Sequence, residues 1–126
     1  MRAVDTNVLV RLIVRDNHKQ TDAAEAFIAK GAWVSHIVLA ELSWVLESVY
    51  DLHPELIALS VDMLLNHEHL TVQEPEMVAI ALRNFRKRPA VSFSDNLIVE
   101  IARKSGHLPL GTFDRHLAGT DGAQRL

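Results

Sequence analysis

Short apolar runs alternate along this chain with longer segments whose apolar residues recur at helical spacing. The runs are residues 2–4, 32–35, 70–72 and 108–113. Such alternation predicts parallel strands joined by right-handed helical crossovers, with helices covering both faces of the sheet. We therefore expect an α/β fold, a three-layer sandwich with a central parallel sheet of four to five strands flanked by helices. The tail after Asp114 has room for one turn of helix and an edge strand.

The helical segments are bounded by residues that favour helix starts and ends. The starts carry capping residues or prolines suited to a first turn: Asp16-Asn17, Pro54, Pro75, and Ser92 or Ser94. The ends are marked by Gly31, Pro89 and Gly106. Periodicity predicts these core-facing side chains: Leu56, Leu59, Met63 and Leu64 after Pro54, and Leu97, Ile98, Ile101 and Ala102 in the last long helix.

Length and composition indicate one globular domain over residues 1–126, with 48% apolar and 23% charged residues. There is no cysteine, which excludes a disulfide framework and a thiolate zinc site. No apolar run has the length of a membrane span, and the N-terminal residues do not resemble a signal peptide. A cytoplasmic location is expected.

The formal charge of −3 argues weakly against nucleic acid as a partner, because phosphate binders are usually basic. This argument fails if some of the acids hold metal ions. With four of the 16 acidic residues set aside for a metal, the remainder would be slightly basic, since the chain has 13 Lys and Arg.

Two acids follow short apolar runs directly. Asp5 comes after residues 2–4 and Asp114 after residues 108–113. In open parallel sheets, ligands bind in the crevice at the carboxyl ends of the strands, where both acids are expected. The alternative for each is a helix N-cap, a position that short polar residues favour.

Two further acids lie on the expected helices. Glu41 is at the margin of the apolar stripe of the 36–50 segment and is expected beside the sheet, whereas Glu47 lies nearly opposite that stripe and is expected in solvent. Asp95 falls in a first helical turn, where free backbone N–H groups and the helix dipole favour a carboxylate. Taken alone, Asp95 is therefore best interpreted as an ordinary helix-start acid.

The four acids taken together indicate a metal site. Clustered carboxylates repel one another and favour protonation unless a cation compensates them. Mg²⁺ prefers oxygen ligands and keeps several waters, so a few carboxylates from different elements suffice. Two such ions about 3.5–4 Å apart can activate a water for phosphodiester hydrolysis.

Four motifs in this order resemble those of the PIN-domain ribonucleases, and within them the VapC toxins of bacterial toxin–antitoxin pairs. The motifs are Asp5-Thr6-Asn7-Val8-Leu9-Val10, then Val38-Leu39-Ala40-Glu41-Leu42 with Trp44-Val45-Leu46, then Phe93-Ser94-Asp95-Asn96-Leu97-Ile98, and Thr112-Phe113-Asp114. No single motif is specific, but four in register cover nearly the whole chain.

The resemblance implies a PIN-like five-stranded parallel sheet, Mg²⁺ or Mn²⁺ as cofactor, and cleavage of RNA. It implies one acidic metal pocket, formed by Asp5, Glu41, Asp95 and Asp114. Asn7 and Thr112 are implied to be polar supports that hydrogen-bond those carboxylates. Asn96 departs from the family, in which a small apolar residue is more common, and could alter the rim of the pocket.

The expected function is that of a metal-dependent endoribonuclease, the toxin of a toxin–antitoxin pair, which hydrolyses RNA through a metal-bound water held by the four carboxylates. The implied partners are a small antitoxin of the VapB type and a second copy of the chain in a homodimer, with Trp44 and Tyr50 as interface candidates. The alternative is a non-catalytic, metal-binding interaction module with the same fold. Haloacid-dehalogenase-like phosphatases are disfavoured, because they need a second acid where this chain has Asn7.

Overall fold

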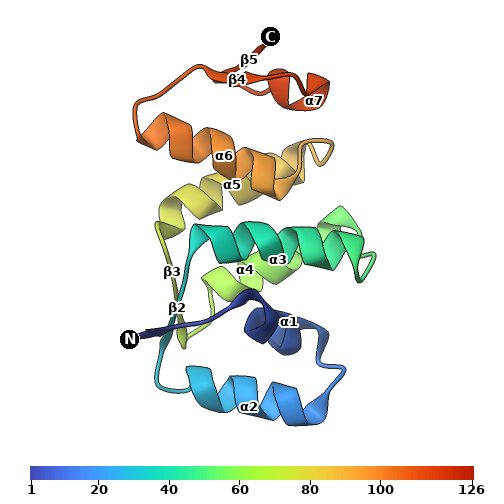
Figure 1. Cartoon of the computed structure of the whole chain (residues 1–126), viewed down its shortest axis with the longest axis vertical. Coiled ribbons are helices and arrows are strands. Elements are labelled where there is room, and N and C mark those ends of the chain that lie inside the picture. The colour runs from blue at the N-terminus through green and yellow to red at the C-terminus, as the bar shows by residue number, and fades with distance from the viewer.

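The computed structural model describes residues 1–126 and contains seven helices and five strands in the alternation that the sequence predicts (Figure 1). The elements are, in chain order, β1 (Arg2–Ala3), α1 (Thr6–Val14), α2 (His18–Ile28), β2 (Ala32–Val34), α3 (His36–Ser48), α4 (Pro54–Leu65), β3 (Leu70–Val72), α5 (Pro75–Lys87), α6 (Phe93–Lys104), β4 (Leu110–Thr112), α7 (Arg115–Ala118) and β5 (Ala123–Arg125). The tail after Asp114 holds both a helical turn and a strand, as predicted. None of the helices is long and apolar enough to cross a membrane.

Local capping chemistry explains where the helices begin. The Asn17 side chain accepts a hydrogen bond from Gln20 N–H at 3.0 Å, and Ser92 Oγ accepts one from Asp95 N–H at 3.1 Å. Pro54 and Pro75 occupy the first turns of α4 and α5, where a missing N–H costs nothing. The predicted helix starts are therefore confirmed, and Ser92 rather than Ser94 is the cap of α6.

The strands form two parallel sheets, one of order β1-β2-β3 and one of order β4-β5. The prediction of one central sheet of four to five strands is wrong in this respect. Helices α5 and α6 lie between the two sheets, so β1 and β4 do not meet within the chain (Figure 1). Helix α6 packs mainly on α5 and α3.

The division of the sheet is matched by a division of the core. A cluster of 23 buried residues runs from Val4, directly after β1, to Leu97 and includes side chains from β2, β3 and the first six helices. A separate cluster contains only Val91, Val99 and Leu117. A parallel strand covered by helices on both faces would be buried, but Arg2 and Ala3 are exposed because β1 is an edge strand with β2 as its single neighbour.

Two predicted core faces are partly wrong. In α4 the side chains of Leu56, Leu59 and Met63 are exposed. Leu64 is buried as predicted, together with Ile57, Ala58, Ser60 and Val61. Apolar residues lie on both sides of this helix, so periodicity alone did not select the correct face.

In α6, Leu97 is buried as predicted. Ile98 and Ile101 are exposed, whereas Asn96 and Glu100 are buried. The burial of these polar groups is compensated by partners. Asn96 Nδ2 donates to the carbonyl oxygens of Val91 and Ser92, and Glu100 pairs with Arg103. These bonds allow the two polar side chains to lie on the buried face of α6.

Candidate active site

Asp5 lies at the exit of β1 and caps α1. Its Oδ1 accepts a hydrogen bond from Thr6 N–H at 2.7 Å, and the backbone of Asp5 is extended, as at a typical N-cap. The carboxylate is exposed to solvent. Asp5 thus lies at a strand exit and also caps a helix, so both interpretations made from the sequence apply to it. Its second carboxylate oxygen is free to bind a ligand.

Asp114 occupies the same position in the C-terminal part of the chain. It follows β4 and caps α7, and its Oδ1 accepts a hydrogen bond from Leu117 N–H at 2.8 Å. This bond is the main reason that the pKa of Asp114 is lowered from its ordinary value. Thr112 Oγ1 accepts a hydrogen bond from the backbone N–H of Asp114 at 3.0 Å, so Thr112 supports this acid through its backbone.

Asp95 is half-buried in the first turn of α6. Partial burial raises the pKa of its carboxyl above the ordinary value, a hydrogen bond with Ser92 opposes that rise, and the charge of Asp114 adds to it. The two carboxylates are therefore close enough to repel each other. Asn96, the departure from the family pattern, supports the segment before Asp95 through its bonds to the carbonyls of Val91 and Ser92.

Glu41 and Asn7 project from the N-terminal part of the fold. Glu41 is exposed on α3, next to the buried Leu42. Asn7 is exposed in the first turn of α1 and lines a hollow of about 550 Å³ between α1 and α2. Asn7 makes no hydrogen bond to the predicted acids within the chain, so its supporting role stays a prediction.

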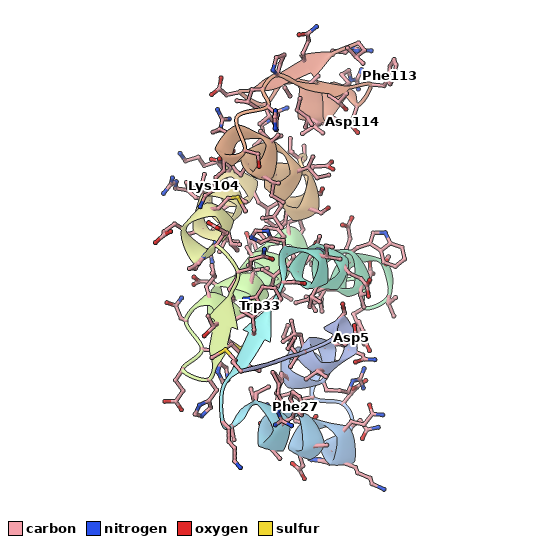
Figure 2. The ribbon with its side chains drawn as sticks, turned by 60° about the vertical axis from the view of Figure 1, so that its left-hand side comes forward. Asp5, Phe27, Trp33, Lys104, Phe113 and Asp114 are labelled. Carbon is pink, nitrogen blue, oxygen red and sulfur yellow. The ribbon has the colours of Figure 1, made fainter.

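The single chain brings Asp95 and Asp114 together but does not gather all four acids. Figure 2 shows Asp5 in the middle of the molecule and Asp114 near one end, beyond α6. No group of three or more acidic or histidine side chains is placed to hold one metal ion. Carboxylate oxygens are suitable ligands for Mg²⁺, but one chain by itself offers no position where an ion would contact all four, so the residues as placed do not fit a shared metal ion.

Sequence reasoning missed the polar contacts that attach the C-terminal elements to α5 and α6. Arg88 Nη2 donates to the carbonyl oxygen of His116 at 2.7 Å, and Arg103 Nη2 donates to that of Asp121 at 2.8 Å. A Cβ atom at Gly119 would lie 2.7 Å from Arg88 Nη2, so glycine leaves room for this arginine. The partners are distant in sequence, and no local pattern indicates such a pairing.

A second missed contact involves Tyr50, which was considered an interface residue. Its hydroxyl accepts a hydrogen bond from Arg11 Nη2 at 2.7 Å, while Arg11 Nη1 pairs with Asp16 at 2.7 Å. Tyr50 is thus half-buried and occupied within the chain. Trp44 is 62% exposed, as expected for a residue off the core stripe.

Parallel strands alternating with helices, with carboxylates at two strand exits, define the chain as an α/β protein. In a comparison with protein families, the PIN domain family matches residues 2–123, and the chain belongs to this family. PIN domains are usually nucleases and generally use divalent metal ions. No curated protein and no solved structure matches the chain.

Replacing Asp95 with asparagine is expected to raise the melting temperature at neutral pH. The raised pKa means that ionised Asp95 destabilises the folded state above its unfolded pKa, and this effect disappears at low pH, where the group is protonated in both states. Asparagine keeps an oxygen for the Ser92 hydrogen bond. Because Asp95 is only half-buried, solvent screening limits the expected rise to about 1–2 °C.

The measurement is thermal unfolding followed at several pH values without divalent metal. The matched control is Glu76→Gln, which neutralises an exposed acid in the first turn of α5. A melting temperature for Asp95→Asn below that of the parent at neutral pH would show that Asp95 acts only as a stabilising helix-start acid.

Proposed function

We propose that this protein is a metal-dependent endoribonuclease that hydrolyses RNA phosphodiester bonds with Mg²⁺ or Mn²⁺. Its metal-binding and catalytic carboxylates are Asp5, Glu41, Asp95 and Asp114, with Asn7 and Thr112 in supporting positions. The observation that carries the proposal is the match to the PIN domain over residues 2–123. The positions of Asp5 and Asp114, each at the exit of a parallel strand, support it.

The biological role that we propose is that of the toxin in a toxin–antitoxin pair, with a small protein of the VapB type as the antitoxin. The outer face of α3 supports a protein partner, because Ile37 is 78% and Trp44 is 62% exposed, seven residues apart on the same side of the helix. Tyr50 contributes less to this surface than expected, since its hydroxyl is bonded to Arg11.

A second candidate function is a non-catalytic interaction module with a PIN fold. The observation that favours it is the separation of the acids within one chain, where no metal-binding group of three acidic or histidine residues forms. The two candidates differ in one measurable property, which is RNA cleavage that depends on a divalent metal.

The purified protein is expected to cleave single-stranded or loop RNA in Mn²⁺ or Mg²⁺ and to stop when EDTA is added. Cleavage should return when metal is supplied in excess of the chelator, because carboxylates bind hard cations reversibly. The assay follows a labelled RNA over time with metal, with EDTA, and after metal is restored. Intact RNA under all metal conditions would favour the interaction module, and cleavage that EDTA does not reduce would exclude a metal-dependent mechanism.

A further inference from the structure

Strand β1 leaves one edge without a partner. Val4 N–H donates to the carbonyl oxygen of Trp33 at 3.1 Å, so Arg2 and Val4 direct their backbone groups toward β2. Since backbone groups alternate in direction along a strand, the N–H and C=O of Ala3 face the open edge, and Asp5 follows on the same side. Ala3 is exposed to solvent.

Strand β4 has an open edge of the same kind. Leu110 N–H donates to the carbonyl oxygen of Gly122 at 2.8 Å, and the carbonyl oxygen of Thr112 accepts from Leu126 N–H at 2.9 Å. Leu110 and Thr112 therefore face β5, and Gly111 and Phe113 face the open edge. The Phe113 side chain beside this edge is 78% exposed (Figure 2).

Within one chain, side-chain contacts keep these two edges apart. Arg2 holds β1 against α2, with its guanidinium carbon 3.9 Å from the centre of the Phe27 ring and its Nη2 donating to the Phe27 carbonyl. At the other end, Arg88 and Arg103 attach the C-terminal elements to α5 and α6. Moving β4 to β1 of the same chain would require the bonds of Arg88 and Arg103 to break.

The exposed surface area is also larger than expected for an isolated chain of this mass. The accessible surface is 7446 Å², whereas a folded monomer of 14.1 kDa has roughly 6,700 Å². The excess of about 700 Å² is close to the surface, about 800 Å², that each partner buries in a stable protein–protein interface of standard size. A second copy of the chain carries both complementary edges and can cover both.

We propose that β1 of one copy pairs in parallel with β4 of a second copy, and reciprocally, so that each acidic site is assembled from two chains. Asp5 and Glu41 come from one copy, and Asp95 and Asp114 come from the other. Two chains related by a twofold axis make this pairing twice and leave neither edge open. The inference rests on the proposed function for the role of the acids, but the pairing itself can be tested without it.

The backbone pattern restricts the pairing to registers that differ by two residues, and we propose the one that places the two acids side by side. With Ala3 opposite Thr112, Ala3 N–H donates to the carbonyl oxygen of Gly111, and Phe113 N–H donates to that of Ala3. Asp5 then lies opposite Asp114, at the carboxyl ends of adjacent parallel strands. The result is two five-stranded parallel sheets, each with strands from both copies, and a place where the acids of β1 and β4 meet.

A disulfide between Ala3→Cys and Thr112→Cys tests the pairing directly. The chain contains no cysteine, so the double variant has only this pair. Directly opposed residues on neighbouring strands are about 4.8 Å apart, within the range that a disulfide bridges. Mild oxidation should give a covalent dimer of twice the 14.1 kDa chain mass on a non-reducing gel.

The single variants are controls and should stay monomeric on that gel, and the pair Ala3→Cys with Leu110→Cys, shifted in register by two residues, should cross-link much less. A disulfide closed within one chain would overturn the proposal in favour of pairing inside the monomer. Thiols that remain free in the double variant would also overturn it.

Complementation between inactive variants tests the shared site. Asp5→Asn and Asp114→Asn each keep a capping residue, and each should abolish cleavage alone. When the two chains are unfolded and refolded together, half of the dimers contain one chain of each kind, and one of the two sites in such a dimer is intact. Activity should therefore return to about one quarter of the parent value.

The two proposals fail in different ways in these experiments. If the parent cleaves RNA but the refolded mixture of variants regains no activity, the proposed nuclease function stands and the proposal of a shared site is overturned. If the parent cleaves no RNA, the proposed function fails, and the disulfide experiment alone decides whether the strands pair between copies.

Discussion

Substitution of Asp5 by asparagine is expected to lower the rate of metal-dependent RNA cleavage by at least about a hundredfold, the scale on which removal of one essential charged or polar group slows an active site. The fold should be preserved. Asparagine caps helices as well as aspartate does, and the Asn side-chain oxygen can accept the Thr6 hydrogen bond that Oδ1 accepts at 2.7 Å. The measurement combines the cleavage rate with the melting temperature.

The control for Asp5→Asn is Asp16→Asn, which removes a nearby exposed acid that pairs with Arg11. It should leave the cleavage rate close to that of the parent. A second matched pair lies on α3, where Glu41→Gln should reduce cleavage and Glu47→Gln should not, although both side chains are exposed. A folded Asp5→Asn protein with undiminished cleavage would remove Asp5 from the active site.

Substitution of Phe93 by alanine is expected to reduce the free energy of unfolding by about 3–5 kcal/mol. Phe93 is 1% exposed and belongs to the large core cluster. Its ring meets that of Phe85 edge to face, with the ring centres 6.4 Å apart, and thereby joins α6 to α5. Truncation leaves a cavity in this contact, and urea unfolding followed by circular dichroism measures the loss.

Phe113→Ala is the matched control for Phe93→Ala, because it truncates the same side chain where it is 78% exposed. In the isolated chain it should change the free energy of unfolding by less than about 0.5 kcal/mol. A loss below about 1 kcal/mol for Phe93→Ala would show that α6 is held in place by contacts other than this aromatic pair.

Local chemistry made most of the fold predictable. Asn17 and Ser92 cap the helices that their positions predict, and Pro54 and Pro75 lie in first turns. The 70–72 run forms β3 with the predicted bounds. These features depend on residues within one or two turns of each other, which is why sequence alone suffices to find them.

The pairing of strands could not be predicted in the same way. Whether β1 meets β4 depends on where α5 and α6 lie, and contacts between residues distant in sequence, such as the ion pair between Lys104 and Glu74, contribute to that placement. The positions of Asp5 and Asp114 at strand exits follow from local sequence. The distance between these acids depends on tertiary structure. One continuous sheet would place them close together, and that assumption is wrong for the single chain.

The division between the two cores affects the order in which parts of the protein fold during synthesis. A ribosome releases the N-terminal part of a chain first, and the large core needs no residue beyond Leu97. The main body can therefore fold while β4 and Asp114 are still being synthesised. The carboxylate after β4 emerges last of the four, so a newly made chain reaches its folded core before it possesses all the groups that would cut RNA.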